Sequence, residues 1–190
     1  MVSHIEANGH RCAIVGGVAV SIRARERFTK DIDFAVAVES DSQAEALGLA
    51  VQQAGYKLPQ VFENTAKGLL ATFRFVVPGG RAEPEIDLLF ASSGIEDEVV
   101  SEAELLEILP GFMAPVARLP HLIAMKVLAE SDVREHDRSD LRALIAVATK
   151  REPGAAKNAV RLIEDRGFAR GKKLEEVLEA FVNATLAGGA

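Results

Sequence analysis

The sequence predicts an α+β protein, in which a mixed β-sheet with helices precedes a C-terminal helical bundle. Three observations predict this class. A strand, helix and strand pattern lies near the N-terminus, an apolar hairpin lies near the middle, and the composition then shifts to helix formers. We therefore expect a sheet-containing part over residues 1–115 and about four helices over residues 116–190.

The first part opens with two apolar strands separated by a helix. "RCAIVGG" is typical of a short strand that ends in glycines, "VAVSIRARERF" of a helix, and "IDFAVAV" of a second strand. "SDSQAEALGLAVQQAGY" predicts an amphipathic helix with a serine or aspartate cap and a stop at Gly55. "LLATFRFVV" and "EIDLLF" then predict a hairpin joined by the turn "PGGRAEP".

The second part reads as four helices. The first of them, "PHLIAMKVLAES", begins at Pro120, a residue that suits the first turn of a helix. "RSDLRALIAVATK", "AAKNAVRLIEDRG" and "KLEEVLEAFVNATLA" continue the pattern, with "REPG" and "FARGK" as breaks between them.

Composition excludes several classes of protein. Hydrophobic residues make up 48% and charged residues 26% of the 190, which is typical of a globular chain and not of a disordered or fibrous one. No apolar run reaches the roughly 18 residues of a membrane span, and the N-terminus lacks the apolar core of a signal peptide, so we expect a cytoplasmic protein without a membrane partner. Cys12, the single cysteine, lies in an apolar run and is expected to be a buried structural thiol.

The charge is unevenly distributed. The chain has a net charge of -6, but residues 1–117 carry -8 and residues 118–173 carry +5. A basic block suggests a polyanionic partner for the second part, and an acidic block suggests metal binding by some acids of the first. The alternative is that the basic residues only decorate solvated helices.

Two acids stand side by side on the second predicted strand. Asp31 and Asp33 alternate with apolar Ile32 and Phe34, so both carboxylates point to one face, roughly 7 Å apart at the backbone. Like charges at this spacing repel, and burial would raise the pKa of both groups unless a cation lay between them. This face is therefore either open to water or occupied by metal.

Glycines and a third acid point to phosphate chemistry. Gly16 and Gly17 follow the first strand, where backbone amides at a helix N-terminus can approach a phosphate closely. Asp87 lies on a further strand, and three carboxylates on neighbouring strands could hold two divalent ions about 4 Å apart. Such a pair of ions clamps the attacking and leaving oxygens of a phosphoryl displacement. Each feature alone also fits an ordinary turn or a solvated surface acid.

These motifs resemble those of the DNA polymerase beta nucleotidyltransferase superfamily. Its signature of Gly-Gly, a spacer of about a dozen residues, Asp-x-Asp and a later lone Asp is matched by "VGG", "DID" and "IDL". The further motifs "RFTKDID", "MKVLA" and "REHDRSDL", the last starting at Arg134, are similar to those of the AbiEii-type nucleotidyltransferases of bacterial toxin-antitoxin systems.

The resemblance implies a set of site residues. The implied metal ligands, for two Mg²⁺ ions, are Asp31, Asp33 and Asp87. The residues implied to bind the nucleotide, an NTP, are Gly16, Gly17, Arg27, Thr29, Lys126 and Asp137. The implied catalytic residues are the three metal ligands with Lys126 and Asp140. From the residues alone, Lys126 could instead be a surface lysine, Asp137 and Asp140 a cap and salt-bridge set, and Arg27 a surface partner of Asp31 or Asp33.

The resemblance also implies a reaction. Similar enzymes transfer a nucleoside monophosphate from an NTP to RNA, notably the 3′ end of tRNA, and a toxin of this type has a cognate antitoxin. Two alternatives stay open. One is nucleotidyl transfer to a small molecule, as in the antibiotic-modifying enzymes of the superfamily, and the other is a catalytically inactive fold that serves as a binding module.

Overall fold

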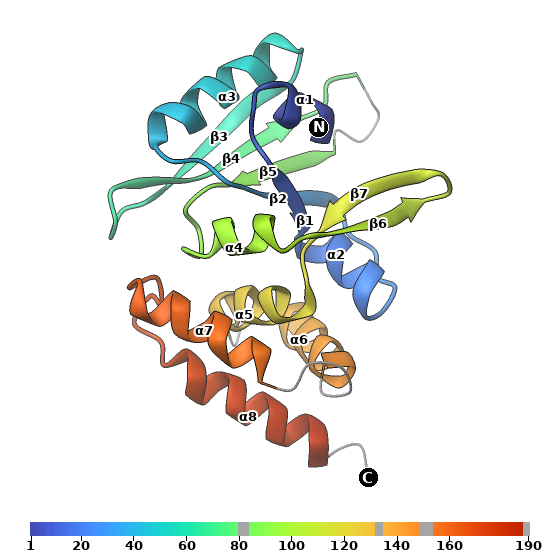
Figure 1. Cartoon of the computed structure of the whole chain (residues 1–190), viewed down its shortest axis with the longest axis vertical. Coiled ribbons are helices and arrows are strands. Elements are labelled where there is room, and N and C mark those ends of the chain that lie inside the picture. The colour runs from blue at the N-terminus through green and yellow to red at the C-terminus, as the bar shows by residue number, and fades with distance from the viewer. Residues whose placement is uncertain (80–83, 132–134, 149–153, 188–190) are drawn as a thin grey trace. The chain divides into compact units, whose positions relative to one another are not determined.

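The structure of the protein is a computed structural model that describes residues 1–79, 84–131, 135–148 and 154–187 (Figure 1). Its strands are β1 (Cys12–Val15), β2 (Asp31–Val36), β3 (Lys57–Asn64), β4 (Leu69–Val76), β5 (Glu85–Leu89), β6 (Glu104–Leu109) and β7 (Phe112–Val116). Its helices are α1 (Val2–Ala7), α2 (Gly16–Arg23), α3 (Asp41–Gln53), α4 (Glu96–Ser101), α5 (Leu119–Ala129), α6 (Glu135–Ala148), α7 (Ala155–Asp165) and α8 (Leu174–Ala187).

The chain divides into two compact units. The sheet unit comprises Met1–Ala19, Phe28–Ser92 and Glu96–Ala117, and the helical unit comprises Val20–Arg27, Ser93–Ile95 and Arg118–Ala190. Short segments from the first half of the chain therefore belong to the helical unit.

All strands of the sheet unit join one mixed sheet in the order β3-β4-β5-β2-β1-β7-β6. The pairs β2–β5 and β1–β7 are parallel and the others are antiparallel, which confirms the predicted mixed sheet. The predicted hairpin is also confirmed, since β4 and β5 pair antiparallel with Phe73 opposite Leu88. Residues 80–83 of its turn lie outside the described residues.

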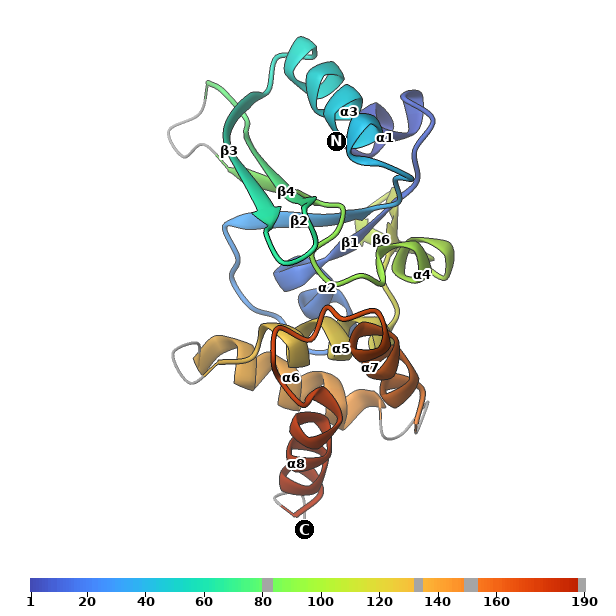
Figure 2. The same cartoon turned by 90° about the vertical axis from the view of Figure 1, so that its left-hand side faces the viewer.

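Helix α3 packs on one face of this sheet, on the same side as α1 (Figure 2). The Ser40 hydroxyl accepts a hydrogen bond from the backbone amide of Gln43, so the predicted N-terminal cap is confirmed. The helix ends before Gly55, as predicted, and Gly48 faces the ring of Phe73 on β4. Phe73, Leu88 on β5 and Phe34 on β2 form one buried apolar row on this side of the sheet.

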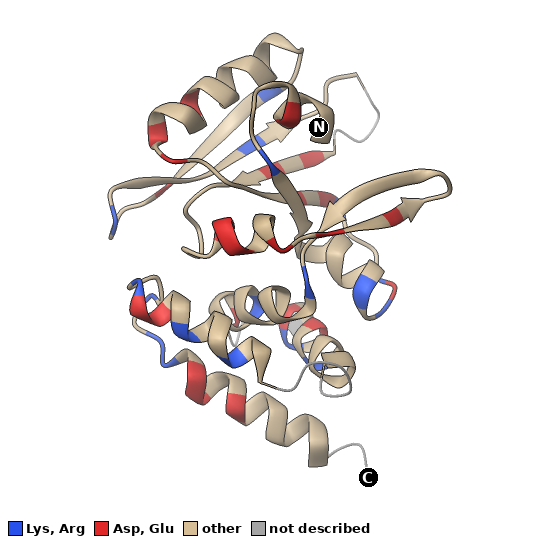
Figure 3. Ribbon diagram, viewed as in Figure 1, with Lys and Arg blue, Asp and Glu red and all other residues tan. Residues whose placement is uncertain are grey.

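The helical unit contains the four predicted helices α5 to α8, which are confirmed. Residues 149–153, which include most of the predicted "REPG" break, lie outside the described residues. The buried apolar residues of α5, α6 and α7 include Leu122, Ile123, Leu141, Leu144, Ile145 and Ile163. Helix α7 carries both basic and acidic residues, whereas the charged residues of α8 are all acidic (Figure 3), and Arg161 on α7 pairs with Glu175 on α8 at 2.9 Å. None of the described helices is both long and apolar enough to cross a membrane.

The hairpin of β6 and β7 was not predicted from the sequence. The residues "ELLEIL" of β6 are mostly good helix formers, yet they pair antiparallel with β7. Pro110 and Gly111 make the turn between the two strands, and Gly111 has a positive φ of 76° that suits glycine. Pairing with the sheet thus overrides the local preference for helix.

Candidate active site

The acids that the sequence singled out lie on one face of the sheet unit. Asp33 on β2 is directly opposite Asp87 on β5, and Asp31 is opposite Glu85 in the same parallel pairing. Directly opposite residues on paired strands share a face, and residues two apart on a strand do too. Asp31, Asp33, Glu85 and Asp87 therefore project from one side of the sheet, which we call the acid face, opposite to the apolar row beneath α3.

Gly16 brings the backbone of the α2 N-terminus against the acid face. It has a φ of +60°, and a Cβ at this position would lie 1.8 Å from Oδ2 and 2.9 Å from Cβ of Asp33. Since Val15 pairs directly with Asp33, β1 and β2 set this close approach. Only glycine has both the backbone freedom and the space needed here. Gly17 follows as the second residue of α2, within the first turn, where amides have no partner inside the helix.

Thr29 orders the segment that leads into β2. Its hydroxyl donates a hydrogen bond of 3.2 Å to the backbone carbonyl of Asp31. In this structure Thr29 thus acts on the backbone of the acid strand.

Arg74 on β4 is a further member of the acid face, and the sequence analysis did not single it out. Its Nε and Nη2 donate hydrogen bonds to Oδ1 and Oδ2 of Asp87, each at 2.8 Å. Its Nη1 lies 3.2 Å from Oε2 of Glu85, and its guanidinium carbon lies 5.5 Å from the ring centroid of Phe62 on β3. The hydrogen bonds to Asp87 and the charges of Asp87, Glu85 and Asp31 raise the pKa of Arg74 further above its ordinary value.

A signal for Arg74 was present in the sequence. Alternation along "LLATFRFVV" places Arg74 on the face opposite to Phe73 and Phe75, and the predicted hairpin would bring it next to the strand of Asp87. A charged residue at such a position needs a partner of opposite sign.

The contact with Arg74 limits how the acids could hold a metal ion as they stand. Both oxygens of Asp87 accept hydrogen bonds from Arg74, so an ion shared with Asp33 would have to compete with the guanidinium for that carboxylate. Within the part of the chain that the structure describes, no group of three or more His, Cys, Asp or Glu is arranged to hold an ion. The acid face is therefore assembled, but three carboxylates do not converge on one point, and the metal-binding role of Asp31, Asp33 and Asp87 stays a prediction.

The remaining predicted site residues form a charge cluster within the helical unit. Lys126 on α5 lies 2.6 Å from Oδ1 of Asp137 and 3.0 Å from Oδ2 of Asp140, both on α6. Nη1 of Arg27 donates a hydrogen bond of 2.7 Å to the same Oδ2 of Asp140. Asp140 thus pairs with two cations, Lys126 and Arg27.

The side chains of this cluster are largely buried. Asp140 is fully buried, and Lys126 and Asp137 have side chains only 13% and 14% exposed. Ser21 fixes Arg27 from the backbone side, because its hydroxyl donates to the Arg27 carbonyl at 3.1 Å and accepts from the Arg27 amide at 3.3 Å. Arg134 of the resembling motif lies outside the described residues.

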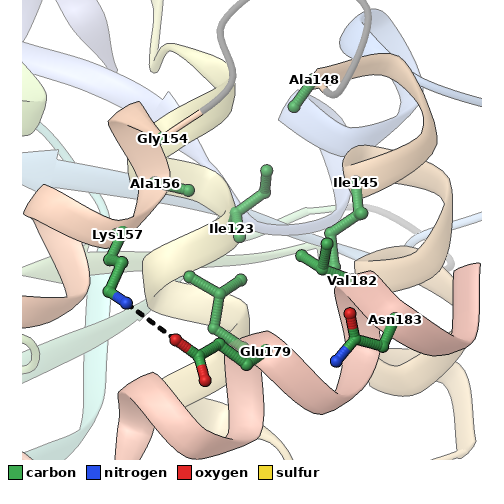
Figure 4. A pocket seen from close by; sticks show the side chains of 10 residues that line it. Ile123, Ile145, Ala148, Gly154, Ala156, Lys157, Glu179, Val182 and Asn183 are labelled. Carbon is green, nitrogen blue, oxygen red and sulfur yellow. Dashed lines mark hydrogen bonds and ion pairs between the residues drawn. The ribbon is translucent and has the colours of Figure 1, made fainter. Parts of the chain in front are cut away.

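A cavity of about 250 Å³ also lies within the helical unit (Figure 4). Its lining is mainly apolar, with Ile123 and Ile145 among its walls, and its charged residues Lys157 and Glu179 are paired at 2.7 Å. None of the predicted site residues lines it. The cavity therefore lacks groups suited to phosphate transfer.

Comparison with known proteins identifies the family. The sequence model for "Nucleotidyl transferase AbiEii toxin, Type IV TA system" matches residues 3–187. No curated protein matches the chain. Among solved structures, JHP933 from Helicobacter pylori aligns at 15% identity over 98% of this chain and 86% of its own, with a TM-score of 0.44. The antibiotic-resistance factor ANT(2'')-Ia aligns at 18% identity over 98% of this chain and 90% of its own, with a TM-score of 0.41.

The two structural likenesses are too weak to bear on the chemistry of this chain. The family match carries the assignment, because it spans nearly all residues, including the glycine pair, all three aspartates and the Lys126 cluster. The chain belongs to the AbiEii nucleotidyltransferase toxin family, and it is a nucleotidyltransferase.

Proposed function

We propose that this nucleotidyltransferase uses Mg²⁺ to transfer a nucleoside monophosphate from an NTP to RNA, at the 3′ end of tRNA, as the toxin of a toxin-antitoxin system. The observation that carries the proposal is the row on the acid face. Asp33 and Asp87 are directly opposite each other, and Gly16 at the start of α2 lies against Asp33. Carboxylates beside a glycine-bearing helix N-terminus suit a polyphosphate with its cations.

In the proposed reaction the acceptor hydroxyl attacks the α-phosphate of the NTP, and pyrophosphate leaves. Asp31 and Asp33 are the proposed ligands for Mg²⁺, which when bound would supply the positive charge that phosphoryl transfer requires. The amides at Gly16 and Gly17 cradle the triphosphate. Asp87 is the third acid, and its carboxylate becomes useful to the ion or to the acceptor hydroxyl only after it leaves Arg74.

The cluster in the helical unit has a proposed role in nucleotide binding. Lys126 supplies a positive charge for the phosphates, and Asp137 and Asp140 hold its ammonium group in place. Arg27 shares Asp140 with Lys126 and is proposed to contact the nucleotide too, with Thr29 ordering the segment between Arg27 and the acid strand. We propose that residues 1–115 form the catalytic core and residues 116–190 the helical bundle.

The net charge of +5 over residues 118–173 supports an RNA acceptor. Part of this charge is already paired inside the helical unit, as with Lys157 and Arg161 opposite Glu175. We propose a cytoplasmic location, where both NTP and tRNA are present, and a cognate antitoxin protein as partner.

The test is to incubate the protein with labelled NTPs and total tRNA, and to compare wild type with Asp33→Asn. The matched control is Asp97→Asn, which removes the same charge from an exposed carboxylate on α4. We expect the wild type and D97N to label RNA in Mg²⁺ and D33N to lose at least about 100-fold. Labelling by D33N at the wild-type rate would refute the assignment.

Other outcomes separate the alternatives. Transfer to an aminoglycoside but not to RNA would identify a small-molecule enzyme. An absence of any transfer, together with an absence of heat on calorimetric titration with Mg-NTP, would identify an inactive module.

A further inference from the structure

Repulsion among the carboxylates of the acid face is reduced by Arg74. Asp31, Asp33, Glu85 and Asp87 project from one side of two neighbouring strands, and four carboxylates at this spacing repel one another. The sequence alone suggested metal as the neutralising cation. In the structure, the guanidinium of Arg74 neutralises Asp87 and Glu85.

The contact is built for Asp87 in particular. Strands β4 and β5 are hydrogen-bonded neighbours, and Arg74 on β4 is directly opposite Asp87 on β5, so the two side chains emerge side by side. The two parallel hydrogen bonds of 2.8 Å use both oxygens of the carboxylate, which is a strong and directional form of ion pair. Asp87 is 8% exposed and the side chain of Arg74 is 28% exposed, with the ring of Phe62 against the guanidinium, so the carboxylate is the better shielded partner of the pair.

We infer that Arg74 is a positioning residue that shields the third carboxylate, so that in the nucleotide-free protein Asp87 does not bind the divalent ion held by Asp31 and Asp33. Each oxygen of Asp87 accepts a hydrogen bond from Arg74, and a divalent ion at a remaining lone pair would lie close to the positive charge of the guanidinium. Divalent affinity is therefore set by two carboxylates until Arg74 withdraws. This inference rests on the proposed metal site and adds the residue that regulates it.

The test measures Mn²⁺ affinity without nucleotide, from the electron paramagnetic resonance signal of free Mn²⁺, in a double-mutant cycle of Arg74→Gln and Asp87→Asn. We expect R74Q to tighten Mn²⁺ binding about tenfold, since it removes a nearby positive charge and frees two oxygens. Asp87→Asn should weaken Mn²⁺ binding a few-fold when Arg74 is present, because only a nearby negative charge is lost, and by about tenfold more in the R74Q background, where a ligand is lost as well.

Two controls separate shielding from general charge and from folding. Arg161→Gln removes the same charge from an arginine that is also paired to a carboxylate, Glu175 on α8, and should leave Mn²⁺ affinity unchanged. Arg74→Lys keeps the charge but loses the rigid pair of parallel donors that the guanidinium aims at Asp87, so it should bind Mn²⁺ several-fold more tightly than wild type. If circular dichroism shows that R74Q does not fold, the Mn²⁺ affinity of R74K tests the shielding of Asp87 in its place.

The inference is overturned if R74Q, or R74K in its place, binds Mn²⁺ no better than R161Q, or if D87N has the same effect in both backgrounds. Such a result would leave the proposed function intact as long as Asp33→Asn still abolishes Mn²⁺ binding. If D33N binds Mn²⁺ as wild type does, the metal site itself is wrong, and both proposals fall.

Discussion

Replacement of Gly16 by alanine probes the closest approach in the active site. The added methyl group would lie 1.8 Å from Oδ2 of Asp33, whereas ordinary contact begins at 3.4 Å, so the carboxylate has to move by about 1.6 Å. Side-chain rotation cannot relieve the whole clash, because Cβ of Asp33, which the backbone fixes, would be only 2.9 Å away. The side chain of Asp33 is thus displaced, and the backbones of β1 and β2 have to move slightly apart.

The expected loss of activity follows from this displacement. A misplacement of about 1 Å in a catalytic group costs on the order of 100-fold in rate, so G16A should lose at least about that factor in nucleotidyl transfer to tRNA under single-turnover conditions. The positive φ of +60° adds a stability cost of about 1 kcal/mol for any residue other than glycine.

The matched control is Gly111→Ala in the turn between β6 and β7. Gly111 also has a positive φ, +76°, but an added Cβ would meet nothing within 4 Å. It should therefore lose about 1 kcal/mol, or roughly 2–4 °C in melting temperature, and keep its activity. Transfer by G16A within threefold of that by G111A would refute the idea that Asp33 acts from its position against Gly16.

Two further predictions concern buried ionisable groups. Asp140→Asn removes the negative charge that Arg27 and Lys126 share, so it should destabilise the protein by about 3 kcal/mol in urea denaturation. Asp137→Asn leaves Asp140 in place and should cost about 1 kcal/mol. Equal losses of stability in the two variants would contradict the central position of Asp140. Burial raises the pKa of the Cys12 thiol to about 12, so at pH 8 only roughly one part in ten thousand of it is thiolate. Iodoacetamide should therefore label Cys12 in urea but not in the folded protein. Equal labelling rates in the two conditions would contradict the burial of Cys12.

Sequence reasoning succeeded where local pattern and tertiary structure agree. The strands around Asp33 and Asp87 are apolar runs with clear ends, and α3 has both a serine cap and a glycine stop, so their positions follow from short-range rules. The four C-terminal helices follow from their apolar periodicity.

The elements that sequence reasoning missed depend on partners far away in the chain. Strand β3 is largely exposed and contains Pro59, so it lacks the apolar alternation of a half-buried strand and is recognised only from its pairing with β4. Strand β6 has a helix-like composition that the sheet overrides. The contact of Arg74 with Asp87 needs the exact register of the hairpin, because a shift of one residue would turn the two side chains to opposite faces.

The parallel pairing of β2 and β5 has a consequence for how the protein is made. Parallel neighbours cannot be joined by a tight turn, and here the chain passes through α3, β3 and β4 before it returns with β5 beside β2. A ribosome that has translated only as far as residue 84 has made β2 and its neighbour β1, but not β5, the strand that carries Asp87. For a member of a toxin family, this order of synthesis means that an interrupted translation product is expected to be harmless to the cell that makes it.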